Sequence, residues 1–390
     1  MHRTFGKIAC IKASRPPGSI PELTFERMRL NQSSGIATQL IPDCNVVIDM
    51  ILAAGSTEKA VLAKERLAPF IHFLQSCQSQ GITYYLSPFM GLNEMRRSEA
   101  ALGPSALEIF SENHGLTWTD THPHLKPNLA EIGLVERGYD ALSPESQGVL
   151  CKTYGPILLM LAVARDTPHL SPLARFRTYL RFYHRIINVV SVREITIARF
   201  VFSAPPPATD PAYETWKNIS LNFTGRRDLS QNFPRTFRQL DRTALNGALD
   251  LTILDSALLA DYKGLDGQRL DTWVVTADLK LAALTDAIHH TDGATGQTGL
   301  FLATQDYRDL GSYWNETQND MDNLNHKFRP NLKFSAAVQR ARTDGVVGLA
   351  QQGIDGAIRC PGRPLRFSGI QNPDYSDSKP NFSIIPPPFG

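Results

Sequence analysis

Several features that would assign this 390-residue chain to a common protein class are missing from its sequence. Cysteine is scarce: the five residues Cys10, Cys44, Cys77, Cys151 and Cys360 are scattered, and no two form a C-x-x-C pair. This spacing argues against a disulfide framework and against a zinc knuckle. We therefore expect a protein that works in a reducing compartment.

Membrane and export signals are also missing. The opening, MHRTFGKIAC, lacks the apolar segment of a signal peptide. The apolar stretch PILLMLAVA, near the middle of the chain, is too short to span a bilayer. The sequence therefore predicts a cytoplasmic protein that has no membrane partner.

The sequence has no large excess of either charge. It also lacks three common catalytic motifs. The chain has 40 Lys and Arg against 38 Asp and Glu, so a nucleic-acid-binding protein of this composition would need to cluster its basic residues. It contains no G-x-x-x-x-G-K-[ST], no H-E-x-x-H and no G-x-S-x-G motif. P-loop NTPases, metalloproteases with that zinc helix and α/β-hydrolases are thereby excluded.

What the sequence does contain is a repeated order of strand and helix. Hydrophobic residues make up 42% of the chain, which is enough for a sizeable core. Residues 40–48 predict a buried strand, 69–80 an amphipathic helix and ITYYLSP, at 82–88, a second strand. Further on, 246–262 predict a helix and 272–277 another buried strand. This order predicts an α/β fold with a mostly parallel sheet.

Acidic residues stand at the ends of these predicted strands or on the helices beside them. Asp43 belongs to the segment of the first strand, Glu94 comes just past the second, Asp255 lies on the helix, and Asp278 stands at the exit of the last strand. Ligands of open α/β sheets bind outside the carboxyl ends of the strands, so these acids could converge there. Side by side they would need a cation, and Mg²⁺ or Mn²⁺ suits such oxygen ligands.

The segments IPDCNVVID, LSPFMGLNE and ILDSALLADY…WVVTADLKL resemble the acidic motifs of PIN-domain nucleases. The resemblance implies a three-layer α/β/α fold and metal-dependent endoribonuclease activity. It makes Asp43, Glu94, Asp255 and Asp278 the catalytic and metal-binding set, with Asn45 and Thr276 as supporting polar residues. It also divides the chain into an N-terminal extension (1–39), a nuclease domain (40–300) with a helical insertion at about 97–245, and a partly irregular C-terminal extension (301–390).

Other interpretations of these acids stay open. Glu194, in NVVSVREITIARF, also stands in a setting like the family's Glu motif and competes with Glu94. Asp43 could cap a turn and Asp278 could cap the helix that follows it, which does not exclude metal binding. Asp255 could lie on a solvated helix face.

Two rows of arginines could bind the phosphates of RNA. One is formed by Arg177, Arg181 and Arg185 and the other by Arg235, Arg238 and Arg242, although either could be an ordinary solvated helix face. We therefore expect a metal-dependent nuclease. Its expected partner is nucleic acid, in particular RNA, and a homo-oligomer or a protein partner is a further possibility. The alternatives are a catalytically inactive PIN-like module that binds nucleic acid or a protein partner, and an enzyme acting on a small phosphorylated molecule.

Overall fold

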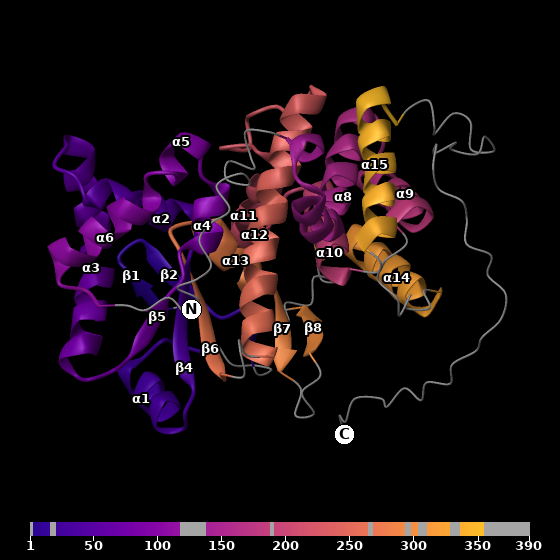
Figure 1. Ribbon diagram of the computed structural model, residues 1–390. Helices are drawn as coiled ribbons and strands as arrows, with labels where there is room; N and C mark the ends of the chain where they lie inside the picture. Colours follow the sequence, from indigo (N-terminus) through magenta and orange to yellow (C-terminus); the bar gives the residue numbers. More distant parts are fainter. Residues whose placement is uncertain are drawn as a thin grey trace, which may run out of the picture.

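The structure, a computed structural model, describes residues 3–15, 21–117, 138–187, 191–263, 268–292, 298–302, 310–327 and 336–354 (Figure 1). The fold is α/β, as expected, and helices predominate in it. A five-stranded sheet lies at one end of the molecule, and a bundle of helices lies at the other (Figure 1). The predicted tail beyond residue 361 lies outside the described residues.

The five-stranded sheet is mixed, which corrects the expectation of a mostly parallel one. Its strand order is β1-β2-β6-β4-β5. The strands are β1 (Arg3–Phe5), β2 (Ile8–Ile11), β4 (Ala37–Pro42), β5 (Tyr84–Leu86) and β6 (Leu270–Thr276). β4 pairs in parallel with β5 and β6, whereas β2 pairs antiparallel with both β1 and β6. The parallel half of the sheet is therefore the half that the sequence predicted.

The first 39 residues were expected to form an extension, but much of this segment belongs to the sheet. β2 pairs along β6 through Ala9, Cys10 and Ile11, and β1 covers the outer edge of β2. The helix α1 (Phe25–Ser33) then leads into β4. All four residues of the short β2 are buried, so this N-terminal segment forms part of the hydrophobic core.

Neighbouring residues of the central strands enter two different cores. Trp273 and Val275 of β6 join the cluster beneath α2 (Cys44–Ala53) and α3 (Glu58–Ser79), and Val274 joins the cluster on the helical side. The alternation follows from the two-residue period of a strand. Pro69 was expected in the first turn of its helix but lies inside α3. Both faces of the sheet are therefore covered by apolar side chains.

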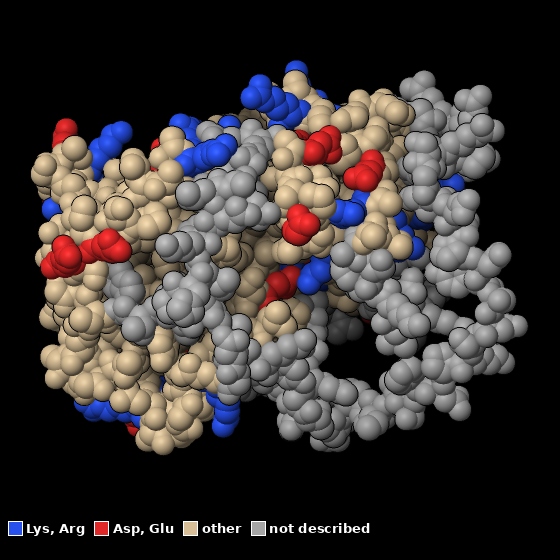
Figure 2. All heavy atoms as spheres, in the orientation of Figure 1, with Lys and Arg blue, Asp and Glu red and all other residues tan. Residues whose placement is uncertain are grey.

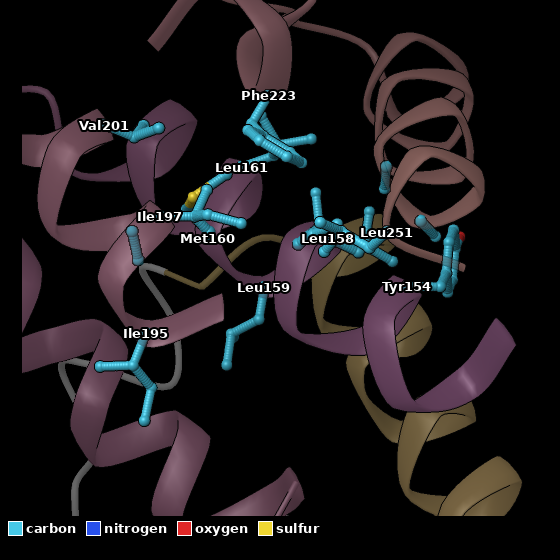
Figure 3. Packing of buried hydrophobic residues seen from close by; sticks show 14 of the residues in the cluster. Tyr154, Leu158, Leu159, Met160, Leu161, Ile195, Ile197, Val201, Phe223 and Leu251 are labelled. Atoms are coloured by element: carbon cyan, nitrogen blue, oxygen red, sulfur yellow. The ribbon is translucent and has the colours of Figure 1, made fainter. Parts of the chain in front are cut away.

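The helical side is built by the predicted insertion and the segments that follow it. Its main helices are α8 (Pro144–Asp166), α9 (Pro172–Phe182), α10 (Val192–Phe202), α11 (Ala212–Thr224), α12 (Phe237–Lys263) and α15 (Ala336–Gln352). A π-helix, η2 (Tyr183–Ile187), continues α9. Figure 3 shows Leu158 of α8 and Leu251 of α12 within this cluster. α12 begins nine residues earlier than the sequence predicted, and its length matters for the site.

Within the described part of the chain, α8 is the one helix long and apolar enough to cross a membrane. It contains the PILLMLAVA stretch that was judged too short for a span. Most of it is buried by other helices, and a core helix passes the same test as a membrane span. The finding is therefore weak support for a membrane segment.

Smaller elements complete the fold. On the sheet side these are α4 (Phe89–Glu94), α5 (Arg97–Ala100) and α6 (Gly103–His114), whereas α13 (Leu279–Ala287) packs against α11 on the helical side. A 3-10 turn, η1 (Tyr139–Ala141), precedes α8, and α14 (Ser312–Lys327) packs against α9. Residues 291–300 were predicted to be linker, but β7 (Ile288–Asp292) and β8 (Thr298–Leu302) form a second sheet with β3 (Ser14–Arg15).

Candidate functional site

The parallel strands β4 and β6 end side by side, and this places Asp43 and Asp278 close together. In the strand register, Pro42 of β4 pairs with Val275 of β6, so Asp43 follows beside Thr276. The backbone N–H of Asp43 donates to the Val275 carbonyl at 2.9 Å. Asp278 comes two residues after Thr276. The carboxyl ends of these strands therefore meet as predicted.

Thr276 links the two aspartates. Its hydroxyl donates to Oδ2 of Asp43 and accepts the backbone N–H of Asp278 at 2.8 Å. Asp43 also caps α2, because its Oδ1 accepts the N–H of Val46 at 2.8 Å. Asp278 caps α13 by accepting the N–H of Lys280 at 2.8 Å. Both aspartates are thus helix caps. Asp278 also lines the cavity described below, whereas Asp43 is buried beside it.

Glu94 reaches this place because a glycine lets α4 approach α2. A Cβ atom on Gly91 would lie 2.6 Å from Cγ2 of Val47 and 3.0 Å from the carbonyl oxygen of Asp43. Contacts this short do not occur between folded side chains and backbone, so only glycine allows the approach. Glu94 then lies near enough to Asp43 and Asp250 for their charges to affect its ionisation.

Gly91→Ala is therefore expected to move α4 away from α2 and to displace Glu94. We expect the free energy of unfolding to fall by about 1–3 kcal/mol from overpacking, with a lower affinity for Mn²⁺. Thermal unfolding and Mn²⁺ titration measure the two effects. Gly81→Ala, at a positive-φ glycine where a Cβ would meet nothing within 4 Å, is a control that strains a turn elsewhere. An unchanged Mn²⁺ affinity in Gly91→Ala would contradict this role.

The fourth acid of the site is Asp250, which the sequence analysis missed. It lies on α12 and accepts a hydrogen bond from Nδ2 of Asn222 on α11 at 3.1 Å. Gly247, one turn earlier, allows the close approach of these helices, since a Cβ there would lie 2.9 Å from the ring of Phe223. Asn222 therefore fixes Asp250 from within the helical insertion.

Asp255, the predicted acid of α12, is not brought to the site. Five residues of an α-helix correspond to a rotation of about 140°, so Asp250 and Asp255 point to different sides. Asp255 accepts from Nη1 of Arg193 at 2.7 Å and pairs with Lys152 at 3.1 Å. Burial opposes its ionisation, but these two cations outweigh burial and lower its pKa. Asp255 belongs to a structural ion-pair cluster.

Glu194, the predicted alternative to Glu94, belongs to that same cluster. It is buried on α10 and pairs with Arg193 at 3.0 Å. Burial raises its pKa although Arg193 opposes the rise. The structure therefore places Glu94, and not Glu194, beside Asp43.

Three of the site carboxyl groups, those of Asp43, Glu94 and Asp250, have raised pKa values. Burial raises the pKa of Asp43 to about 6, and the hydrogen bond from Thr276 limits the rise. Burial, followed by the charge of Asp278, raises the pKa of Asp250 to about 8. Burial together with Asp250 and Asp43 raises the pKa of Glu94 well above its usual value. The charges of these acids therefore repel one another across the site.

Glu94, Asp250 and Asp278 line a cavity of about 750 Å³ between the sheet and the helical side, and the buried Asp43 lies directly behind its lining residues Cys44 and Asn45. Its lining residues are Cys44, Asn45, Ile48, Glu94, Met95, Arg96, Glu99, Gly138, Asn222, Arg238, Asp241, Arg242, Asn246, Asp250 and Asp278. The side chain of Asn45 also hydrogen-bonds to Asp43, which it helps to ionise. The cavity thus combines carboxylates with three arginines.

The predicted arginine row on α9 and η2 does not line this cavity. Arg177 pairs with Asp320 at 2.8 Å and with Glu316 at 3.1 Å, both on α14. Arg181 and Arg185 are exposed. The second row does reach the cavity, through Arg238 and Arg242. Figure 2 shows Lys and Arg atoms along the upper edge of the molecule, over α5 and the upper end of α12.

The donor chemistry fits a hard divalent cation, but the spacing is not that of a closed ligand shell. In the segments that the structure describes, no three His, Cys, Asp or Glu side chains form a group arranged to hold a metal ion. Mg²⁺ commonly binds through one or two carboxylates and keeps several waters, so it does not need three direct protein ligands. The pKa values of Asp43, Glu94 and Asp250 are raised first by burial and then by the charges of neighbouring acids, and this clustering of buried acids is the observation that favours an ion here.

Besides the acids and arginines, the thiol of Cys44 also lines the cavity, and a thiol could in principle act as a nucleophile. Burial raises its pKa, and the charges of Glu94 and Asp43 raise it further. A thiolate is the reactive form of cysteine, so this setting disfavours a cysteine nucleophile.

Comparisons with protein-family models, with curated proteins and with solved structures found no match for this chain.

Proposed function

We propose that this protein is a metal-dependent nuclease that hydrolyses phosphodiester bonds, as an endoribonuclease. The observation that carries the proposal is that carboxyl groups from four separate segments, those of Asp43, Glu94, Asp250 and Asp278, lie close together at one cavity. Glu94, Asp250 and Asp278 line the cavity, and the pKa values of Asp43, Glu94 and Asp250 are raised. Arginines line the same cavity. Acids that share a metal ion, beside basic side chains that bind phosphates, are an arrangement that suits metal-dependent phosphodiester hydrolysis.

The likeness to PIN-domain nucleases supports the same proposal in a modified form. The four acids keep the family's order along the chain when Asp250 takes the helical position in place of Asp255. Helices on both faces of the sheet are compatible with the three-layer fold of that family. The two antiparallel N-terminal strands and the long helical insertion depart from the pattern that the motifs implied.

Asp43, Glu94, Asp250 and Asp278 would hold Mg²⁺ or Mn²⁺ directly or through water. When bound, such an ion lowers the pKa of a coordinated water and neutralises charge on the phosphate. The protein's own residues orient the acids: Thr276 and Asn45 hold Asp43, and Asn222 holds Asp250. Because the pKa of Asp250 is raised to about 8 and that of Glu94 is raised well above its usual value, ion binding would displace protons from these acids.

The direct test is incubation of the full chain with an internally labelled single-stranded RNA at pH 7.5. We expect internal cleavage with Mn²⁺ and none with EDTA. Hydrolysis of a simple phosphate monoester without any cleavage of RNA would instead indicate an enzyme of small phosphorylated molecules.

A second proposal is a catalytically inactive PIN-like module that binds nucleic acid or a protein partner. One observation favours it: in the described segments, no three potential ligands form a group arranged to hold a metal ion. RNA binding without cleavage, whichever divalent cation is supplied, would identify the module.

A further inference from the structure

One face of α12 changes from cationic to acidic along its length. Arg238, Arg242, Asn246 and Asp250 are spaced four residues apart, and all four line the cavity. Side chains four apart lie on one face of a helix, one above the next. We call these four residues the α12 stripe. It runs from two arginines near the start of the helix to the acid among the site carboxylates.

The dimensions of the α12 stripe exceed those of a single phosphate group. Twelve residues separate Arg238 from Asp250, which corresponds to about 18 Å of helix at 1.5 Å per residue. In double-stranded DNA the phosphates of one strand are spaced about 3.4 Å along the helix axis, and at that spacing this length spans about five phosphates. A mononucleotide bound at Asp250 would therefore leave Arg238 unused.

The two arginines are available to a ligand. Both are exposed, and within the described segments neither forms an ion pair with an acidic side chain. Arg96, at the start of α5, lines the same cavity from the sheet side. By contrast, the exposed Arg177 of the other row is held by Asp320 and Glu316. The cavity therefore offers phosphates two exposed arginines on the α12 stripe.

We propose that the α12 stripe is a phosphate-binding track along which a nucleic-acid chain lies, with Arg242 and Arg238 contacting phosphates successively farther from the bond at the acids. The proposal rests on the proposed nuclease function and deepens it, because it makes recognition depend on chain length. A substrate with several consecutive phosphates engages both arginines, whereas a dinucleotide reaches only the acidic end of the track.

The test measures binding without turnover. Fluorescence anisotropy in EDTA, between 50 and 300 mM salt, gives the affinity of the full chain for fluorescein-labelled dodecauridylate. For Arg238→Gln/Arg242→Gln we expect about tenfold weaker binding at 150 mM salt. We also expect a salt slope shallower by about 1.4, since each phosphate contact to a single strand contributes about 0.7. Binding of labelled UpU should not change.

The matched control removes the same charge elsewhere. Arg181→Gln/Arg185→Gln lowers the net charge by two at exposed residues that do not line the cavity, and it should keep the wild-type slope. An unchanged salt slope in Arg238→Gln/Arg242→Gln would refute the proposed phosphate-binding track. An equal loss of slope in the control variant would refute it as well.

Hydrolysis of bis(p-nitrophenyl) phosphate with Mn²⁺ by the wild type tests the nuclease proposal separately. If it fails while the salt slopes differ as expected, the nuclease is refuted and the track stands. If it succeeds while the slopes agree, the track is refuted and the nuclease stands.

Discussion

Asp250→Asn is expected to reduce Mn²⁺-dependent RNA cleavage at pH 7.5 by about 10²–10³-fold, the size of loss typical for one group that stabilises charge in a transition state. Asp250 is held by Asn222 and faces the charges of Asp278 and Asp43. Asparagine keeps the shape and the hydrogen bond but removes the negative charge. Initial cleavage rates at saturating RNA measure the effect.

Asp255→Asn is the matched control on the same helix. It removes a carboxylate that pairs with Arg193 and Lys152, and Arg193 keeps its contact with Glu194. We expect the free energy of unfolding to fall by about 1–3 kcal/mol because a charge pair of the cluster is broken, while the cleavage rate at 25 °C stays within about threefold. A larger loss of cleavage in Asp255→Asn than in Asp250→Asn would contradict the assignment of the site.

The second large effect concerns stability and pH without divalent cations. The pKa of Asp250 is raised to about 8 and that of Glu94 well above its usual value. Between the unfolded and folded pKa values, the folded chain binds more protons than the unfolded chain, so stability falls as pH rises. In EDTA, we expect the melting temperature to fall by about 5 °C between pH 6.5 and pH 8.5.

The lower limit of this window is set by histidines. Burial lowers the pKa of His289 to about 4 and also lowers that of His290. Neutral histidine is favoured in the folded chain, so these two residues add stability as pH rises toward 6.5 and would mask the acids below that pH. Above it, the acids dominate.

Two comparisons isolate the acids in this melting experiment. Asp250→Asn should flatten the pH dependence, and Asp255→Asn should keep it. Addition of 5 mM Mg²⁺ should raise the melting temperature more at pH 8.5 than at pH 6.5, because the ion binds the deprotonated acids. A melting temperature that rises with pH in EDTA over this window would refute the assigned electrostatics.

The positions of the two aspartates at the strand ends were predictable from sequence. Asp43 and Asp278 follow buried β-branched runs, and parallel strands bring their carboxyl ends to one edge of a sheet. The first strand was predicted too long, since β4 ends at Pro42 and α2 begins at Cys44. The capping role of Asp43 marks that boundary, and such boundaries are the least reliable part of a sequence prediction.

The helical acid was not predictable in the same way. Which side of α12 faces the strand ends depends on packing against α8 and α11, and these helices come from the insertion. The spacing of Arg238, Arg242, Asn246 and Asp250 was the available signal, because it places polar residues on one helix face. The edge strand β1 was missed because its three residues, RTF, carry no period.

Isothermal titration with Mn²⁺ at pH 7.5 tests most directly whether these four carboxylates share a divalent ion. The account predicts a site in the wild type and in Asp255→Asn, its loss in Asp250→Asn, and an apparent heat that varies with the ionisation enthalpy of the buffer as protons are released. Equal Mn²⁺ binding by the wild type and Asp250→Asn, or no binding by the wild type, would contradict it.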